Sequence, residues 1–256
     1  MTLALGIDVG GTKIVAGLVE TANGEVVRSE RVPTRPERGG EAVLADCAGL
    51  AERLGASDAP VGVGICEVVD LDGRVTSAET VDWRGLDVAS AFSPASVTVE
   101  SDIRAAAVAE ARFGAGAGLE SFLHVGVGTG ASACLVVGGR PHRGAHGNAI
   151  ILVAPPVEQV AGGAILGDRA HDPAARGEAA AAVGRVLAVL VNALDPEAVV
   201  VGGGIGSSPG FVDGIAAALR PEVWCESTRG LPIVMSALGE PGGVIGAALA
   251  AVEASR

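Results

Sequence analysis

Residues 3–19 read LALGIDVGGTKIVAGLV: two apolar runs flank a glycine-rich segment, and the first run carries one acid, Asp8. Because glycine accepts positive φ without a Cβ clash, this pattern predicts two strands joined by a tight turn. Such a turn exposes backbone N–H groups and the Thr12 hydroxyl, which can bind phosphate oxygens. Asp8 can hold Mg²⁺ or a metal-bound water beside them. On this stretch alone, an ordinary hairpin with a polar tip is an equal alternative.

The bulk composition is apolar and acidic. The chain has 256 residues, of which 49% are hydrophobic, and this is enough material for two lobes. The formal charge of −12 disfavours nucleic acid and anionic membranes as partners, but leaves nucleotide binding open. No apolar run reaches the ~20 residues that cross a bilayer, and no signal peptide precedes the first strand, so we expect a cytoplasmic protein.

Predicted strands come first in the chain and are followed by alternating helices and strands. In the first half we expect strands at 3–9, 13–19, 25–32, 61–65 and 97–100, with helices at 41–54 and 102–113. This order is typical of a ribonuclease-H-like lobe.

The second half repeats the strand–turn–strand pattern. Predicted strands at 122–127 and 131–137 flank Gly128-Thr129-Gly130, as in the first stretch. We expect further helices near 157–166 and at 178–194, 208–220 and 242–252, with strands at 198–201 and 233–237. An internal duplication would place two phosphate loops opposite each other across a cleft.

Five motifs resemble those of the ROK (repressor, open reading frame, kinase) sugar kinases, in the actin–hexokinase superfamily. The family's D-x-G-G-T-K, E-N-D, G-T-G, V-x-G-G-G and G-x-x-G-A-A motifs are matched in order by Asp8–Lys13, Glu100–Asp102, Gly128–Gly130, Val201–Gly204 and Gly243–Ala247. The resemblance implies an α/β chain with the two-lobed actin-like ATPase (ribonuclease-H-like) fold and a central cleft. Residues 1–104 would form the smaller lobe, with a C-terminal helix at about 243–256 packed on it, and residues 105–242 the larger lobe.

The resemblance also implies ATP and Mg²⁺ as cofactors. Asp102 would be the catalytic base that takes the proton of the attacking hydroxyl, and its place at a helix N-terminus would keep it ionised. Asp8 would hold Mg²⁺ through water. The implied ATP contacts are Asp8, Gly10, Gly11, Thr12, Lys13, Gly128, Thr129, Gly130, Gly202, Gly203 and Gly204. Taken singly, each has a simpler interpretation as a turn residue or an early-helix acid.

The sugar and zinc region departs from the family pattern. Related kinases carry A-G-E-x-G-H, a cysteine cluster and then an acid, whereas here His146-Gly147-Asn148-Ala149 runs into an apolar segment without cysteines. Ile151 and Ala154 stand where the Glu and His are expected, so we do not expect a structural Cys₃His zinc site. Glu158 aligns with the family's final acid, and either binds the acceptor or is a first-turn helix acid.

The acceptor-binding candidates include several departures. They are Glu67, Thr80, Ser101, Asp102, His146, Asn148 and Glu158. Cys66-Glu67 replaces a Pro-Gly pair, and Ser101 and Arg104 replace asparagines. These changes favour an unusual hexose, an amino sugar or a cyclitol over plain glucose, since an added acid such as Glu67 can pair with an amine. For Glu67 and Arg104 singly, a solvated surface charge is the simpler interpretation.

Two functions from different classes therefore follow. The first is ATP-dependent phosphorylation of a hydroxyl on a hexose-like acceptor, with lobe closure that excludes water. The alternative is a catalytically silent sugar-binding or regulatory protein. An acyl phosphate or acetate kinase is less well supported, because few arginines are available for a carboxylate. The resemblance implies a homodimer.

Overall fold

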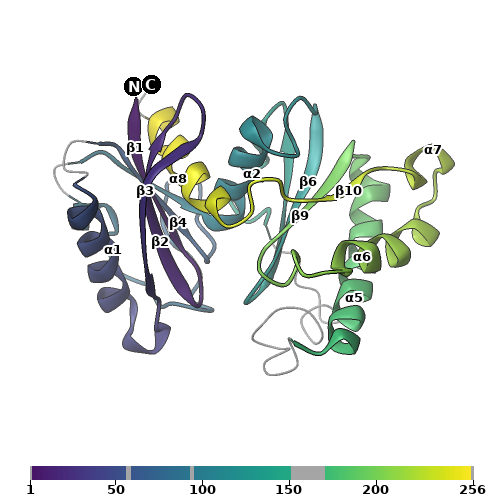
Figure 1. The fold of residues 1–256 in the computed structure, drawn as a ribbon, viewed down its shortest axis with the longest axis horizontal. Helices are drawn as coiled ribbons and strands as arrows, with labels where there is room; N and C mark the ends of the chain where they lie inside the picture. Colours follow the sequence, from purple (N-terminus) through teal and green to yellow (C-terminus); the bar gives the residue numbers. More distant parts are fainter. Residues whose placement is uncertain (1, 56–58, 93–94, 151–170, 255–256) are drawn as a thin grey trace. The chain divides into compact units, whose positions relative to one another are not determined.

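The computed structural model describes residues 2–55, 59–92, 95–150 and 171–254. Its contacts divide the chain into two compact units. Unit 1 comprises Met1–Phe113, Arg143–Ala149 and Pro241–Arg256, and unit 2 comprises Gly114–His142 and Ile150–Glu240. Each unit contains one five-stranded sheet (Figure 1).

The sheet of unit 1 is mixed and has the order β3-β2-β1-β4-β5. Its strands are β1 (Leu3–Val9), β2 (Lys13–Glu20), β3 (Glu25–Pro33), β4 (Val61–Ile65) and β5 (Val97–Ser101). The first three form an antiparallel meander, and β1, β4 and β5 are parallel. As predicted, the glycine-rich segment after β1 is a hairpin connection, because Val9 pairs with Ile14.

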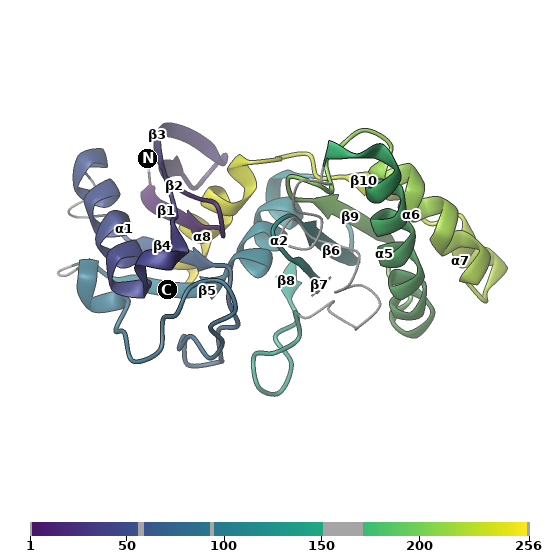
Figure 2. The ribbon, with the colours of Figure 1, turned by 90° about the horizontal axis from the view of Figure 1, so that it is seen from below.

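Helices cover both faces of this sheet (Figures 1 and 2). Helix α1 (Gly40–Leu54) buries Val43, Cys47 and Leu50 in a core cluster that also holds three residues of β1: Leu5, Ile7 and Val9. The opposite face carries α8 (Pro241–Ala254), which also packs against α2 (Asp102–Phe113). Successive strand residues face opposite sides, so β1 turns its even-numbered positions towards α8. Two short 3₁₀ helices, Pro36–Arg38 and Ala89–Phe92, complete the described elements of the unit.

The approach of α8 to the sheet requires glycine. A Cβ added at Gly6 would lie 1.9 Å from the Val244 carbonyl oxygen, and one at Gly62 would lie 1.8 Å from that of Ala247. On α8 itself, a Cβ at Gly246 would lie 1.7 Å from the Ala105 carbonyl oxygen of α2. The glycines on β1 and β4 and the glycine on α8 therefore allow this helix to contact the backbones of both strands and of α2.

The sheet of unit 2 has the order β10-β9-β6-β7-β8. Its strands are β6 (Ser121–Val127), β7 (Ala131–Val137), β8 (Arg140–Pro141), β9 (Ala198–Gly202) and β10 (Ile233–Met235). Strands β6 and β7 are antiparallel, whereas β6, β9 and β10 are parallel. This repeats the hairpin-then-parallel pairing of unit 1, as the predicted duplication requires.

The helices of unit 2 are α5 (Pro173–Leu194), α6 (Phe211–Leu219) and the short α7 (Glu226–Arg229), with a 3₁₀ turn at Arg220–Glu222. Figure 2 shows α5 and α6 side by side next to β9 and β10. Among the described residues, α5 alone is long and apolar enough to cross a membrane by length and composition. It contributes Val183, Leu187 and Val191 to the buried core of unit 2 and is a core helix of that unit.

Several predicted boundaries are corrected. Helix α5 begins at Pro173 rather than 178, because the Asp172 side chain caps it by accepting from the Ala174 N–H at 3.0 Å. Helix α6 begins at Phe211 rather than 208, because Gly210 precedes it with φ 77°. The helix expected near 157–166 lies outside the described residues. A lobe boundary at residue 104 would cut the continuous helix α2, so the two-lobe division stays a proposal with its boundary moved to Phe113.

Candidate active site

Two hydrogen bonds from Thr34 fix the backbone of the hairpin Gly10–Lys13. The Gly10 N–H donates to the Lys13 carbonyl at 3.0 Å, which closes the turn. The buried Thr34 then donates its N–H to the Thr12 carbonyl at 3.1 Å and its hydroxyl to the Gly10 carbonyl at 2.6 Å. Thr12 and Lys13 are exposed at the tip. The hairpin is therefore a fixed polar tip, as phosphate binding requires.

Asp8 lies on the α8 face of β1, at the carboxyl end of the strand. A Cβ added at Gly243, in the first turn of α8, would lie 2.4 Å from Asp8 Oδ2, so a side chain there would displace the Asp8 carboxylate. The half-buried carboxylate is thus kept clear of a side chain from α8. An oxygen ligand in this setting fits a Mg²⁺ ion that keeps its waters and accompanies a nucleotide.

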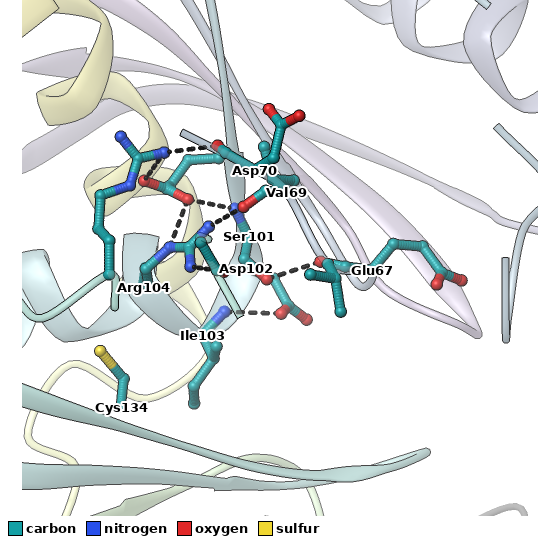
Figure 3. A network of polar contacts seen from close by, with 12 residues as sticks. Glu67, Val69, Asp70, Ser101, Asp102, Ile103, Arg104 and Cys134 are labelled. Carbon is teal, nitrogen blue, oxygen red and sulfur yellow. Dashed lines mark hydrogen bonds and ion pairs between the residues drawn. The ribbon is translucent and has the colours of Figure 1, made fainter. Parts of the chain in front are cut away.

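Asp102 opens α2 directly after β5 (Figure 3). Its Oδ1 accepts from the N–H of Ile103 at 2.6 Å. Burial raises the pKa of Asp102 to about 7, and the negative charges of Asp8 and Glu67 act in the same direction. The expectation that the helix N-terminus keeps this acid ionised holds only in part, because the N–H groups favour the ionised form but desolvation outweighs them. A carboxyl group that titrates near neutrality is suited to general base catalysis.

Ser101 connects Asp102 to the neighbouring strand. It is buried, and its hydroxyl donates to the Glu67 carbonyl at 2.7 Å. This bond joins the end of β5 to the segment that follows β4, which pairs with β5 in parallel. Ser101 therefore fixes the position from which the Asp102 side chain extends.

Glu67 is buried and organises the segment 77–81. Its carboxylate accepts from the Ser77 hydroxyl and from the backbone N–H groups of Glu79 at 3.0 Å, Thr80 at 2.6 Å and Val81 at 3.0 Å. Its interpretation as a solvated surface charge is wrong, because the side chain is buried and its carboxylate accepts hydrogen bonds from protein groups. Thr80 in turn hydrogen-bonds the Cys66 thiol, whose pKa is raised by burial and by the nearby charges of Asp102 and Glu67.

Arg104 is also buried, which again contradicts the surface interpretation. Its Nε donates to Glu100 Oε1 at 2.6 Å and its Nη1 to the Gly147 carbonyl at 2.7 Å. Its Nη2 donates to the Val69 carbonyl at 2.6 Å (Figure 3). Gly147 lies between His146 and Asn148, two acceptor candidates whose side chains are exposed. The guanidinium group thus ties the segment that carries both candidates to α2.

In unit 2, the two predicted nucleotide turns lie next to each other at the carboxyl ends of β6 and β9. Strands β6 and β9 are parallel neighbours, so Gly128–Gly130 and Gly202–Gly204 follow strand ends that lie side by side. The N–H groups of Ile205 and Gly206 both donate to the Val127 carbonyl at 3.0 Å. Gly203 has φ 87°, and a Cβ there would lie 2.3 Å from the same oxygen. These turns form one glycine-lined surface suited to close contact with a nucleotide.

The structure therefore groups the predicted residues in two sets. Asp8, Glu67, Thr80, Ser101 and Asp102 are linked by contacts or electrostatic interactions within unit 1, and the segment of His146 and Asn148 is tied to the same unit. The G-T-G and G-G-G turns lie together in unit 2. Glu158, Ile151 and Ala154 lie outside the described residues, so the lack of a zinc site stays a prediction.

Two structural contributors were absent from the predicted site. Thr34 supports the first hairpin although it lies in the polar loop after β3, and no pattern in that loop marks it. Arg143 contacts Glu100 Oε2 at 3.3 Å and the Asp70 carbonyl at 3.2 Å. No sequence pattern marks the Glu100–Arg104 ion pair either, because Glu100 lies in β5 and Arg104 on α2.

Two mixed sheets of five strands, each with a glycine turn after its first strand, define the actin-like ATPase fold, and comparison with known proteins agrees. A ROK family glucokinase from Streptomyces griseus, in a crystal structure with glucose and AMPPNP, superposes with a TM-score of 0.83 and 27% identity, over 96% of this chain and 98% of that one. A ROK hexokinase from Thermus thermophilus gives 0.77 and 29%, over 99% of both chains.

The ROK family model matches residues 4–150 and 166–254, and the chain belongs to this family. A glucokinase of Streptomyces coelicolor is 33% identical over 153 residues, 57% of this chain and 47% of that enzyme. A kanosamine kinase of Amycolatopsis mediterranei is 38% identical over 146 residues, 54% of this chain and 46% of that enzyme. The bifunctional enzyme NanE/NanK of Brucella melitensis is 32% identical over 95% of this chain and 53% of its own length. The matches thus span about half the length of these relatives.

Proposed function

We propose that this protein is an ATP-dependent kinase that transfers the γ-phosphoryl group to a hydroxyl of a hexose-like acceptor. The observation that carries the proposal is Asp102, a half-buried carboxyl group at the start of α2 with a pKa of about 7, next to the charge of Asp8. Membership of the ROK family and the similarity to glucokinases support the same activity.

Each group has a role in this proposal. Asp102 accepts the proton of the acceptor hydroxyl as its oxygen attacks phosphorus. The Gly10–Lys13 hairpin and the Gly128–Gly130 turn bind phosphate oxygens, and Gly202–Gly204 allow the backbone to approach the nucleoside. Mg²⁺, when bound with ATP, neutralises charge on the phosphates, and Asp8 would hold it through water.

The acceptor is a hexose or an amino hexose. The Glu67 charge does not favour an amine on the acceptor, because its carboxylate already accepts hydrogen bonds from the Ser77 hydroxyl and three backbone N–H groups. The similarity to a kanosamine kinase now supports an amino sugar, and that to glucokinases supports glucose. Thr80, His146, Asn148 and Glu158 remain the proposed acceptor contacts. The expected contact from Ser101 is not proposed again, because this residue is buried and its hydroxyl donates to the Glu67 carbonyl. Ser101 acts by placing Asp102, and Glu67 by placing Thr80.

The test is ADP release with glucose, amino hexoses, N-acetylmannosamine and a cyclitol as acceptors. We expect release that depends on one class of acceptor and on Mg²⁺, and that is lost in Asp102→Asn. Asp213→Asn, which changes an acid in the first turn of α6, is the matched control and should retain activity. Calorimetric binding of a sugar without any turnover would instead support the silent sugar-binding protein.

We also infer a homodimer from the family resemblance, and the cytoplasmic location stays a prediction. Light scattering coupled to gel filtration tests the dimer, and a mass corresponding to one chain at micromolar concentration would contradict it.

A further inference from the structure

We propose that Arg104 is a positioning residue that holds the segment Arg143–Ala149, and with it His146 and Asn148, in place to bind the acceptor. This inference rests on the proposed function and deepens it, since it concerns how the acceptor contacts are held. Arg104 itself touches no reacting atom in this proposal.

The contacts of Arg104 join three distant parts of the chain. All three nitrogen atoms of its guanidinium group donate within 2.6–2.7 Å, to Glu100 in β5, to the Val69 carbonyl after β4 and to the Gly147 carbonyl. The side chain is fully buried, and the Glu100 carboxylate pairs with its charge. Bonds from a buried charged donor are stronger than neutral ones, so the Gly147 carbonyl is firmly placed.

A second set of contacts holds the same segment at its start. Arg143 donates from Nη2 to the Asp70 carbonyl at 3.2 Å and pairs with Glu100 Oε2 at 3.3 Å. Glu100 therefore lies between two arginines, because its Oε1 pairs with Arg104 on α2 and its Oε2 with Arg143 on the segment. The carbonyls of Val69 and Asp70, which are neighbours in the chain, accept from these two arginines.

Gly147 itself packs against the residues that these arginines contact. It has φ 78°, and a Cβ there would lie 2.7 Å from Asp70 Cα and 2.7 Å from the Val69 carbonyl oxygen. The segment thus rests directly on the backbone at 69–70, with the guanidinium bond to its carbonyl beside this contact. His146 and Asn148 flank the point of contact, so their positions follow from it.

Arginine is needed because its planar fork presents several donors in fixed directions, whereas lysine offers one compact charged centre. Arg104→Lys keeps the charge beside Glu100 but cannot reach both carbonyl oxygens. We expect the KM for the acceptor to rise by about 10- to 100-fold, as for a misplacement of roughly 1 Å, with the KM for ATP nearly unchanged. The matched control is Arg112→Lys, an exposed arginine on the same helix, which should change neither constant.

A second pair of variants covers the case in which Arg104→Lys does not fold. Gly147→Ala would force the segment off residues 69–70, while Gly85→Ala carries the same strain at φ 78° with no atom within 4 Å of the new Cβ. Of these two alanine variants, we expect only Gly147→Ala to raise the KM for the acceptor. Hydrogen exchange should be faster at 143–149 in both Arg104→Lys and Gly147→Ala, while the amides of α2 and β4 stay protected.

The outcomes separate this inference from the proposed function. A wild-type protein without acceptor-dependent ADP release contradicts the proposed function, and the affinity for sugar measured by calorimetry then replaces KM in the comparison. Equal rises in the KM for ATP and for the acceptor, or unchanged acceptor affinity with faster exchange at 143–149, would overturn the positioning role of Arg104.

Discussion

Asp102 shows how competing local effects determine the state of one carboxyl group. The N–H of Ile103 stabilises its ionised form, but burial and the charges of Asp8 and Glu67 disfavour that form more strongly. The resulting pKa of about 7 lies far above the ordinary value of 3.8. The group can therefore accept a proton near neutral pH and release it again after transfer.

The activity should depend on pH through this group. Because the base must be deprotonated, we expect kcat/KM to rise about tenfold per pH unit below a pH of about 7 and to level off above it. The measurement is initial ADP release between acid and mildly alkaline pH at fixed free Mg²⁺. A profile that is flat from pH 5 to 8 would show that the titration of Asp102 does not limit the reaction.

Asp102→Asn should remove activity and increase stability. The folded-state pKa lies above the unfolded value, so the stability linked to this proton is present below about pH 4 and is lost as the pH rises through 7. A neutral amide avoids that loss, and we expect a gain of roughly 1–3 kcal/mol at pH 8, discounted for partial exposure. Loss of about 10²–10⁴-fold in kcat should accompany it. Denaturant unfolding at pH 4 and pH 8 measures the effect, and equal stability of the two proteins at both pH values would contradict it.

At the scale of elements, the packing of α8 on β1 and β4 sets the geometry of unit 1. The helix can approach the sheet only where Gly6 and Gly62 lack side chains, and this approach also brings Gly243 against Asp8. The small residues in the C-terminal motif are therefore structural as well as adjacent to the site.

Gly62→Ala should be strongly destabilising. Its Cβ would meet the Ala247 carbonyl at 1.8 Å, so either β4 or α8 must move, and we expect a loss of at least about 2 kcal/mol. Gly49→Ala in α1 is the control, because its nearest contact is 3.4 Å and alanine is the better helix former by about 0.5–1 kcal/mol. Thermal unfolding should thus show shifts of opposite sign, and a neutral Gly62→Ala would mean that the helix is not held at this distance.

Short apolar runs bounded by glycine-rich turns were sufficient to predict most strands and the two hairpin turns, because both are local features of the sequence. The roles of Glu67 and Arg104 were not predictable in this way. Their partners are backbone groups at 79–81, 69 and 147, and only tertiary structure brings these to the side chains. Similarly, Pro209 marks a plausible helix start, but the backbone at Gly210 delays the start of α6 to Phe211.

At the scale of the whole molecule, stability should respond to the proposed substrates. A ligand that binds only the folded state adds about 2.7 kcal/mol at a concentration of 100 times its Kd. We therefore expect MgATP to raise the melting temperature of the wild type and of Asp102→Asn alike, and EDTA to reduce the shift. A melting temperature that does not respond to MgATP, with or without sugar, would contradict nucleotide binding.

The division of unit 1 between distant parts of the chain also has a consequence for biosynthesis. Its first three strands lie within residues 3–33, yet α8, which covers their glycine face, begins only at Pro241. While the ribosome is still translating unit 2, the nascent sheet therefore lacks one of its two covering layers. A chain that ends before α8 would lack this layer permanently, so its sheet would keep one face exposed to solvent.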